Sequence, residues 1–173
     1  AGHDISDRFQ IPQRLYGREN EVAQLLMNFE RVGRGGSNMI LVSGYSGIGK
    51  TCLIKEIYKP ITERRGHFVA GKFDQLNRNI PYSALAAALR DLVRQLLTES
   101  EEHLAVWRAK ILEAVGTNGQ LMIDLIRELA LIVGPQPSPP KVAPLEAEQR
   151  FHRVFLRFIQ VFCRPEHPLV IFL

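Results

Sequence analysis

Lys50 and Thr51 close a glycine-rich stretch whose residue types and spacing suit phosphate chemistry. Residues 44–51 read Gly-Tyr-Ser-Gly-Ile-Gly-Lys-Thr, which fits the pattern G-x-x-x-x-G-K-[ST] of a phosphate-binding loop. The glycines let backbone N–H groups approach phosphate oxygens without a Cβ in the way. The lysine places a positive charge on the β- and γ-phosphates, and the threonine hydroxyl is a ligand for Mg²⁺. The stretch therefore predicts binding of a nucleoside triphosphate, ATP or GTP, together with Mg²⁺.

The candidate cofactor-binding residues of this stretch are Gly44, Tyr45, Ser46, Gly47, Ile48, Gly49, Lys50, Thr51 and Cys52. Among them, Lys50 and Thr51 are the candidate catalytic residues, and Thr51 is the candidate metal ligand.

Two elements must flank such a loop, and the sequence predicts both. Residues 39–43 form a short apolar run that we expect to be a β-strand. Residues 52–58 show helical spacing, with Leu53, Ile54 and Ile57 on one face. A strand, a glycine loop and a helix in this order bring backbone N–H groups around a polyphosphate. The alternative is a glycine-rich turn that matches the pattern by chance.

Apolar periodicity elsewhere predicts further helices and strands, which together indicate an α/β fold built on a parallel sheet. We expect helices over residues 21–31, 82–96, 101–115, 120–133 and 145–162, and strands over 67–73 and 168–173. Ser100 is the expected N-cap of the helix that follows it.

Shifts in composition divide the chain. Residues 1–14 are polar without a sustained period, and we interpret them as a linker. Residues 15–173 are interpreted as the N-terminal part of a P-loop ATPase domain, in which 82–133 is a helical segment. Residues 134–144 are rich in proline and predict a stiff, exposed connector. We favour a spacer here, with a motif for a proline-binding partner as the alternative.

Composition excludes several classes of protein. Of the 173 residues, 46% are hydrophobic and 23% are charged, as in an ordinary soluble globular protein. The formal net charge is +4, but the basic residues alternate with acidic ones, so we expect no nucleic-acid partner. The longest apolar runs are too short to span a bilayer, and the polar N-terminus shows no signal peptide. We therefore expect a cytoplasmic location without membrane insertion.

Three stretches together resemble one family. They are Leu-Tyr-Gly-Arg-Glu at 15–19, the phosphate loop, and Ala-Gly-Lys-Phe-Asp-Gln at 70–75. The family is the AAA-like ATPase domain of large bacterial signalling kinases, common in cyanobacteria and related to the STAND class of NTPases. The resemblance covers essentially the whole chain and includes residues 79–82, 96–101 and 132–137.

The resemblance has four implications. The parent protein would carry an N-terminal serine/threonine kinase domain and C-terminal GAF and histidine kinase domains, which would be partners of this domain. Leu15, Tyr16, Gly17 and Arg18 would lie beside the adenine, although a plain turn with an N-capping role is the alternative from these residues alone. Two acidic residues, a Mg²⁺ ligand and a base, would follow Leu173. A later strand would also insert between the phosphate-loop strand and the strand ending at Leu173.

The last run, residues 168–173, stops before an acidic residue appears. We therefore interpret the chain as a truncated NTPase that lacks the second acidic motif and the later strands, and we expect the isolated chain to be poorly stable or to aggregate.

Three functions remain open. The first is an ATPase module that switches a multidomain signalling kinase. The second is a nucleotide-operated scaffold with little turnover that presents the helical surface of residues 82–163 to protein partners. The third is a small-molecule kinase, which the absence of a substrate-like lid motif makes the weakest. No kinase catalytic loop or D-F-G triplet occurs in the chain, so any protein kinase activity belongs to other domains.

Overall fold

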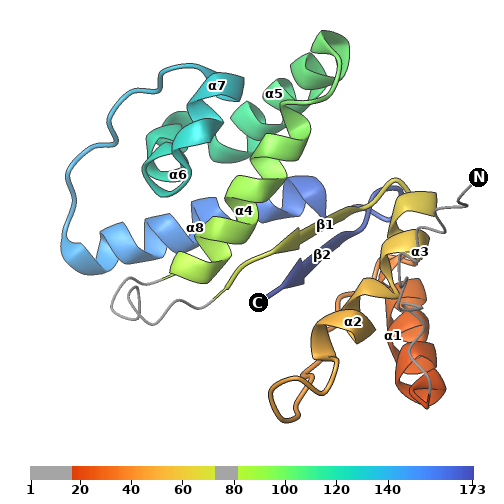
Figure 1. Ribbon diagram of the computed structural model, residues 1–173. Helices are drawn as coiled ribbons and strands as arrows, with labels where there is room; N and C mark the ends of the chain where they lie inside the picture. Colours follow the sequence, from red (N-terminus) through yellow and green to blue (C-terminus); the bar gives the residue numbers. More distant parts are fainter. Residues whose placement is uncertain (1–16, 73–81) are drawn as a thin grey trace, which may run out of the picture.

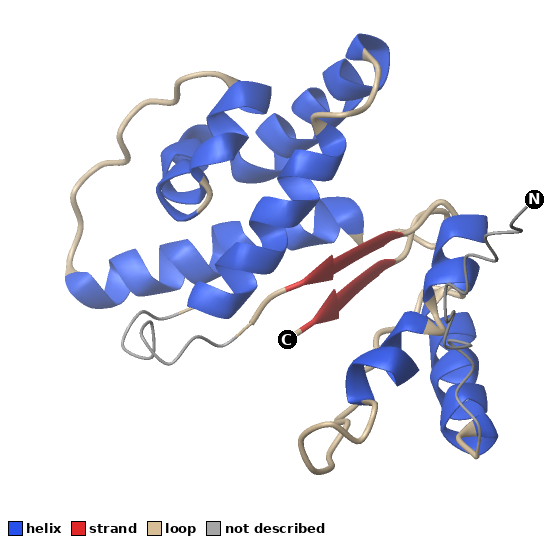
Figure 2. Ribbon diagram, in the orientation of Figure 1, coloured by secondary structure: helices blue, strands red, loops and turns tan. Residues whose placement is uncertain are grey.

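The computed structural model describes residues 17–72 and 82–173 as helices packed on both faces of a small sheet (Figures 1 and 2). One helical group, α1 to α3, lies on one side of the sheet, and a larger group, α4 to α8, lies on the other. The expected linker at residues 1–14 and the candidate residues Leu15 and Tyr16 lie outside the described residues.

The described part of the chain forms a two-stranded parallel sheet. Strand β1 is His67–Ala70 and strand β2 is Leu169–Phe172. The strands pair in register from His67 opposite Leu169 to Ala70 opposite Phe172. The backbone N–H of Gly71 continues the ladder to the Phe172 carbonyl at 2.8 Å. The sequence predicted both strands, and the parallel pairing agrees with the expected α/β class.

Alternation along the strands distributes their side chains between two cores. Val69 and Ile171 face the larger core, which is built from α4 to α8. Phe68 and Val170 face the smaller core, which is built from α1 to α3. Because successive strand residues point to opposite faces, four-residue strands suffice to join two helical layers. The result is a three-layer α/β/α arrangement.

The smaller helical layer carries the residues around the phosphate loop. Helix α1 is Glu19–Val32, with Leu25 and Phe29 buried and acidic residues in its first turn. Helix α2 is Lys50–Lys55, and α3 is Tyr58–Glu63. The predicted helix behind the loop is therefore split at residues 56–57, yet Leu53, Ile54 and Ile57 are all buried as expected.

The larger helical layer follows the predicted order. Its elements are α4 Ser83–Leu96, α5 Glu101–Val115, α6 Gly119–Leu125, α7 Ala130–Val133 and α8 Pro144–Phe162, with 3₁₀ turns at Gly116–Asn118 and Arg127–Leu129. Ser100 accepts a hydrogen bond from the backbone N–H of His103 at 3.4 Å, which confirms it as the N-cap of α5.

One predicted strand does not form. Residues 39–43 were expected to be the strand that carries the phosphate loop, but they lie outside helix and strand. Met39 and Leu41 are 93% and 90% exposed. A strand needs a neighbour for its backbone N–H and C=O groups, and among the described residues β2 pairs only with β1. The run is apolar as predicted, but no strand among the described residues pairs with it.

Candidate functional site

The phosphate loop leads from the extended segment 39–43 into α2. In Figure 1 it projects as an exposed tip below α2. Gly49 is the N-cap of α2 and adopts φ 92° and ψ 18°, a left-handed conformation that favours glycine. Gly47 has φ 81°, and a Cβ built there would meet nothing within 4 Å. The loop therefore keeps its backbone open on the side where a phosphate group would need to approach.

Lys50 lies across the mouth of this loop. Its ammonium Nζ donates to the Gly44 carbonyl at 2.7 Å and to the Tyr45 carbonyl at 2.9 Å. The side chain thus reaches back over the loop from the first residue of α2 and brings its positive charge to the loop's own carbonyls. These bonds keep the ammonium at the glycine loop. A positive charge held at a glycine loop that leads into a helix N-terminus suits a phosphate.

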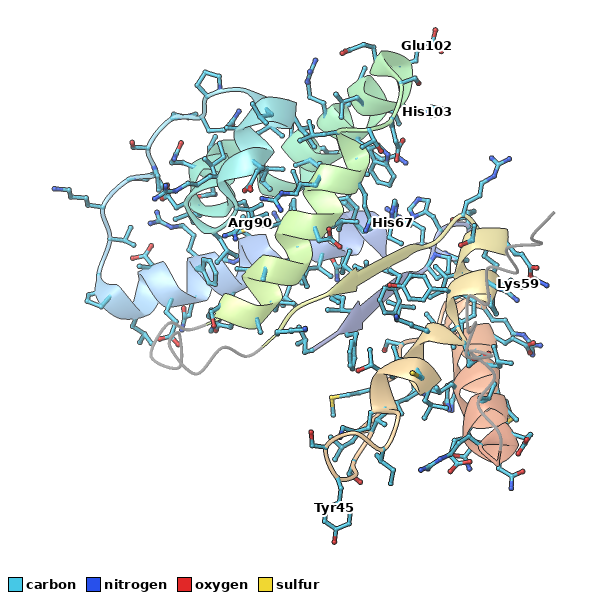
Figure 3. All side chains as sticks on the ribbon, viewed as in Figure 1. Tyr45, Lys59, His67, Arg90, Glu102 and His103 are labelled. Carbon is cyan, nitrogen blue, oxygen red and sulfur yellow. The ribbon has the colours of Figure 1, made fainter. Side chains whose placement is uncertain are left out.

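The other loop residues face solvent. Ser46, Thr51 and Cys52 are exposed, and Ile48 and Tyr45 are 46% and 88% exposed. Tyr45 points away from the body of the protein in Figure 3. On α2 itself, Leu53 and Ile54 are buried, whereas Thr51 and Cys52 are exposed. Thr51 is therefore placed where its hydroxyl can reach a ligand.

Gly17 and Arg18 form the start of α1 rather than part of the loop. The backbone N–H of Gly17 donates to Glu19 Oε1 at 3.1 Å, and Arg18 Nη1 pairs with Glu21 Oε1 at 3.1 Å. The pKa of Glu21 is lowered, first by a backbone hydrogen bond and then by its bond to Arg18. Figure 1 shows the start of α1 at the same end of this layer as the phosphate loop. The adenine contacts expected for these residues stay a prediction.

Sequence reasoning missed the side chains that attach the loop's leading segment to α1. Asn38 donates from Nδ2 to Asn28 Oδ1 on α1. The same Asn38 side chain accepts from the backbone N–H of Met39 at 2.9 Å. Two asparagines ten residues apart carry no sequence pattern that would have revealed this contact.

An apolar groove separates the segment before the loop from the sheet. It has a volume of about 440 Å³, and its walls are residues 38–42 on one side and residues 169–173 on the other, with Leu25, Phe29 and Ile57 at its base. The groove therefore runs beside the strand edge of β2 that β1 leaves free.

The described residues contain neither a cluster of metal-binding side chains nor a membrane-spanning helix. No three His, Cys, Asp or Glu side chains within residues 17–72 and 82–173 are grouped so that they could hold a metal ion. In the same ranges, no helix has the length and apolar character needed to cross a membrane.

A parallel sheet between helical layers, with a glycine loop leading into a helix beside it, is an α/β arrangement consistent with that of P-loop NTPases. A family model described as the AAA ATPase domain matches residues 14–173, and the chain belongs to that family. Domains of this family use nucleotides.

Two curated proteins show similarity. Hybrid signal transduction histidine kinase G of Dictyostelium discoideum is 38% identical over 176 residues, which cover 100% of this chain and 5% of that protein. Histidine protein kinase 1 of Candida albicans is 26% identical over 102 residues, which cover 58% of this chain and 4% of that protein. The chain thus spans only a small part of these relatives, each of which is a much larger kinase. No solved structure matches the chain.

Proposed function

We propose that this chain is the ATP-binding part of a regulatory AAA ATPase module within a multidomain signalling kinase. The observation that carries the proposal is Lys50, whose ammonium is held at 2.7 and 2.9 Å from the carbonyls of Gly44 and Tyr45 in the glycine loop. A nucleotide's phosphates would exchange these carbonyl contacts for an ion pair with the same ammonium. Catalysis would then depend mainly on positioning and charge neutralisation.

Thr51 is the proposed Mg²⁺ ligand because it follows the lysine and its side chain is exposed at the start of α2. Bound Mg²⁺ would neutralise charge on the phosphates. Ser46, Ile48 and Cys52 would contribute backbone N–H groups rather than side-chain chemistry. Leu15, Tyr16, Gly17 and Arg18 are proposed to lie beside the adenine.

We also propose that the groove between residues 38–42 and β2 receives another strand of the same domain. Its walls are mainly apolar, and among the described residues β2 pairs only with β1. A strand there would satisfy both edges and cover Met39 and Leu41. Amide hydrogen exchange in the complete domain tests this: protection of residues 39–43 is expected, and rapid exchange there would contradict it.

The place of the module in a signalling kinase is proposed from its relatives. Both are named as histidine kinases, and one of them aligns with the whole of this chain. The narrower assignment, to the STAND class and to a bacterial-type kinase with serine/threonine kinase and GAF domains, is part of the same proposal and rests on the sequence resemblance.

A second candidate function is a nucleotide-operated scaffold with little turnover. It is favoured by apolar side chains that the larger helical layer leaves exposed: Val106 at 51%, Leu131 at 68% and Leu156 at 59%. If these side chains on α5, α7 and α8 formed one continuous apolar patch, that patch would suit a protein partner.

Turnover separates the two functions. ATP binding and steady-state hydrolysis would be measured in the complete protein with Mg²⁺ and then with excess EDTA. An ATPase is expected to show turnover that requires Mg²⁺ and is lost in the Lys50→Ala variant. Tight nucleotide binding with a rate at background would favour the scaffold, and no nucleotide binding at all would refute both.

A further inference from the structure

The segment between α7 and α8 has a regular pattern of exposure although it is neither helix nor strand. Residues 134–143 read Gly-Pro-Gln-Pro-Ser-Pro-Pro-Lys-Val-Ala and arch from the end of α7 to the start of α8, away from the sheet (Figure 1). From 135 to 143, every third residue is partly buried and the two between are exposed. The partly buried residues are Gln136, Pro139 and Val142.

A period of three is that of the polyproline II helix, which has three residues per turn. Proline fixes φ near the value this conformation needs. Ala143, the last residue of the segment, has φ −60° and ψ 151°, close to polyproline II. The exposure pattern of residues 135–143 therefore fits a three-sided polyproline II segment, here called the rod, which lays one edge on the protein and turns two edges to solvent.

The rod is fastened near both ends. Gln136 Nε2 donates to the Val133 carbonyl at 3.1 Å, at the end of α7. The Gln136 side chain also lies so close to Gly119 that a Cβ there would come within 2.8 Å of it. At the other end, Arg150 Nη1 of α8 donates to the Pro140 carbonyl at 2.9 Å. A plain spacer requires neither attachment. These contacts hold the conformation before any partner arrives.

The two solvent edges carry a recognisable set of side chains. Pro137 and Pro140 share one exposed edge, since they are three residues apart. Pro135 and Lys141 share the other. Among the described residues, Lys141 forms no ion pair. The exposed surface is thus a P-x-x-P pair followed directly by a free cation.

We propose that residues 135–141 are a docking site for a protein domain whose aromatic groove binds polyproline II segments, of the SH3 type. Such grooves take two edges of the rod and leave the third outside, which matches the two exposed edges of this segment. The cation of Lys141 requires an acidic pocket beside the aromatic groove of the partner. Because the rod is already ordered, docking loses less conformational entropy than it would with a free peptide.

The test uses the complete protein and a panel of purified SH3 domains that have an acidic pocket beside the groove, titrated by isothermal calorimetry. Saturable binding is expected from at least one domain. A Pro137→Ala/Pro140→Ala variant should bind that domain about tenfold or more weakly, and a Lys141→Glu variant should also bind it more weakly. The matched control is Pro165→Ala, an exposed proline outside the segment, which should leave the affinity unchanged.

A second, independent test asks whether attachment of the rod to the protein increases its affinity for the SH3 domain. A synthetic peptide of residues 134–143 should bind the same domain more weakly than the protein does, and a Gln136→Ala variant should shift the protein's affinity toward that of the peptide. Absence of saturable binding up to about 1 mM with the whole panel would overturn the proposal. Equal binding by the double proline variant, whose fold is checked by circular dichroism, would also overturn it.

Discussion

Replacing Lys50 by alanine tests the proposed nucleotide site most directly. An ammonium about 4 Å from a phosphate charge is attracted by about 4 kcal/mol at the effective dielectric of a protein surface. Binding must first release the two hydrogen bonds to Gly44 and Tyr45, at 2.7 and 2.9 Å, which cost about 1–2 kcal/mol together in this exposed loop. The difference is about 2–3 kcal/mol, so the Kd for ATP should rise about 30- to 140-fold.

The assay is isothermal titration of the complete protein with ATP and Mg²⁺, with parent and variant compared at the same ionic strength. Lys55→Ala is the matched control, because Lys55 is an exposed lysine at the other end of α2. The affinity of the parent for ATP should also weaken with added salt more steeply than that of Lys50→Ala. A change below about threefold for Lys50→Ala, or an equal loss for Lys55→Ala, would refute the role assigned to Lys50.

The remaining predictions concern stability and are measured by urea unfolding. A Cβ at Gly71 would lie 1.9 Å from the Ala84 carbonyl oxygen, so Gly71→Ala should lose about 3 kcal/mol or more, and a loss near zero would contradict the packing. Burial, and then the charge of His167, lower the pKa of His67 from 6.5. The unfolded chain therefore binds more protons, and stability should fall as pH drops below about 6.5. In His67→Phe this part of the pH dependence should disappear, and an unchanged slope would rule out His67 as its source. Ser100→Ala should lose about 0.5 kcal/mol, the low end for an N-cap because its bond is long at 3.4 Å, and a loss above 2 kcal/mol would mean that Ser100 does more than cap.

Local chemistry explains what could be predicted from the sequence. Ser100 was identified as a cap because its partner, the N–H of His103, lies three residues away. Strands β1 and β2 were identified because short apolar runs bounded by glycine and proline are typical of buried strands. The glycines of the phosphate loop could be identified from local chemistry too. A left-handed conformation such as φ 92° at Gly49 is a property of a single residue, and glycine is the residue that adopts it most easily.

A break in a helix could not be predicted where the apolar residues keep their helical spacing. Residues 120–133 keep helical spacing, so a single helix was expected, but Ile126 has φ −133° and ψ 88° and ends α6. Met122, Ile126 and Leu129 are all fully buried, as the period predicts. The spacing of apolar residues reports which face is buried, and it is satisfied equally by one helix and by two short helices joined by a 3₁₀ turn.

The structure of the segment before the phosphate loop could not be predicted either, because it depends on residues elsewhere in the chain. Residues 39–43 have strand composition, but a strand exists only when a neighbouring backbone accepts and donates its hydrogen bonds. That neighbour is not encoded in the segment itself. Within the described residues, the side-chain hydrogen bonds that position its start are those of Asn38, to Asn28 and to the backbone of Met39. The contact that positions the start of this segment therefore comes from α1. The eight residues of the loop were enough to predict a nucleotide site, which stays a prediction, while the position of the segment before it depends on a contact between Asn28 and Asn38 that no motif describes.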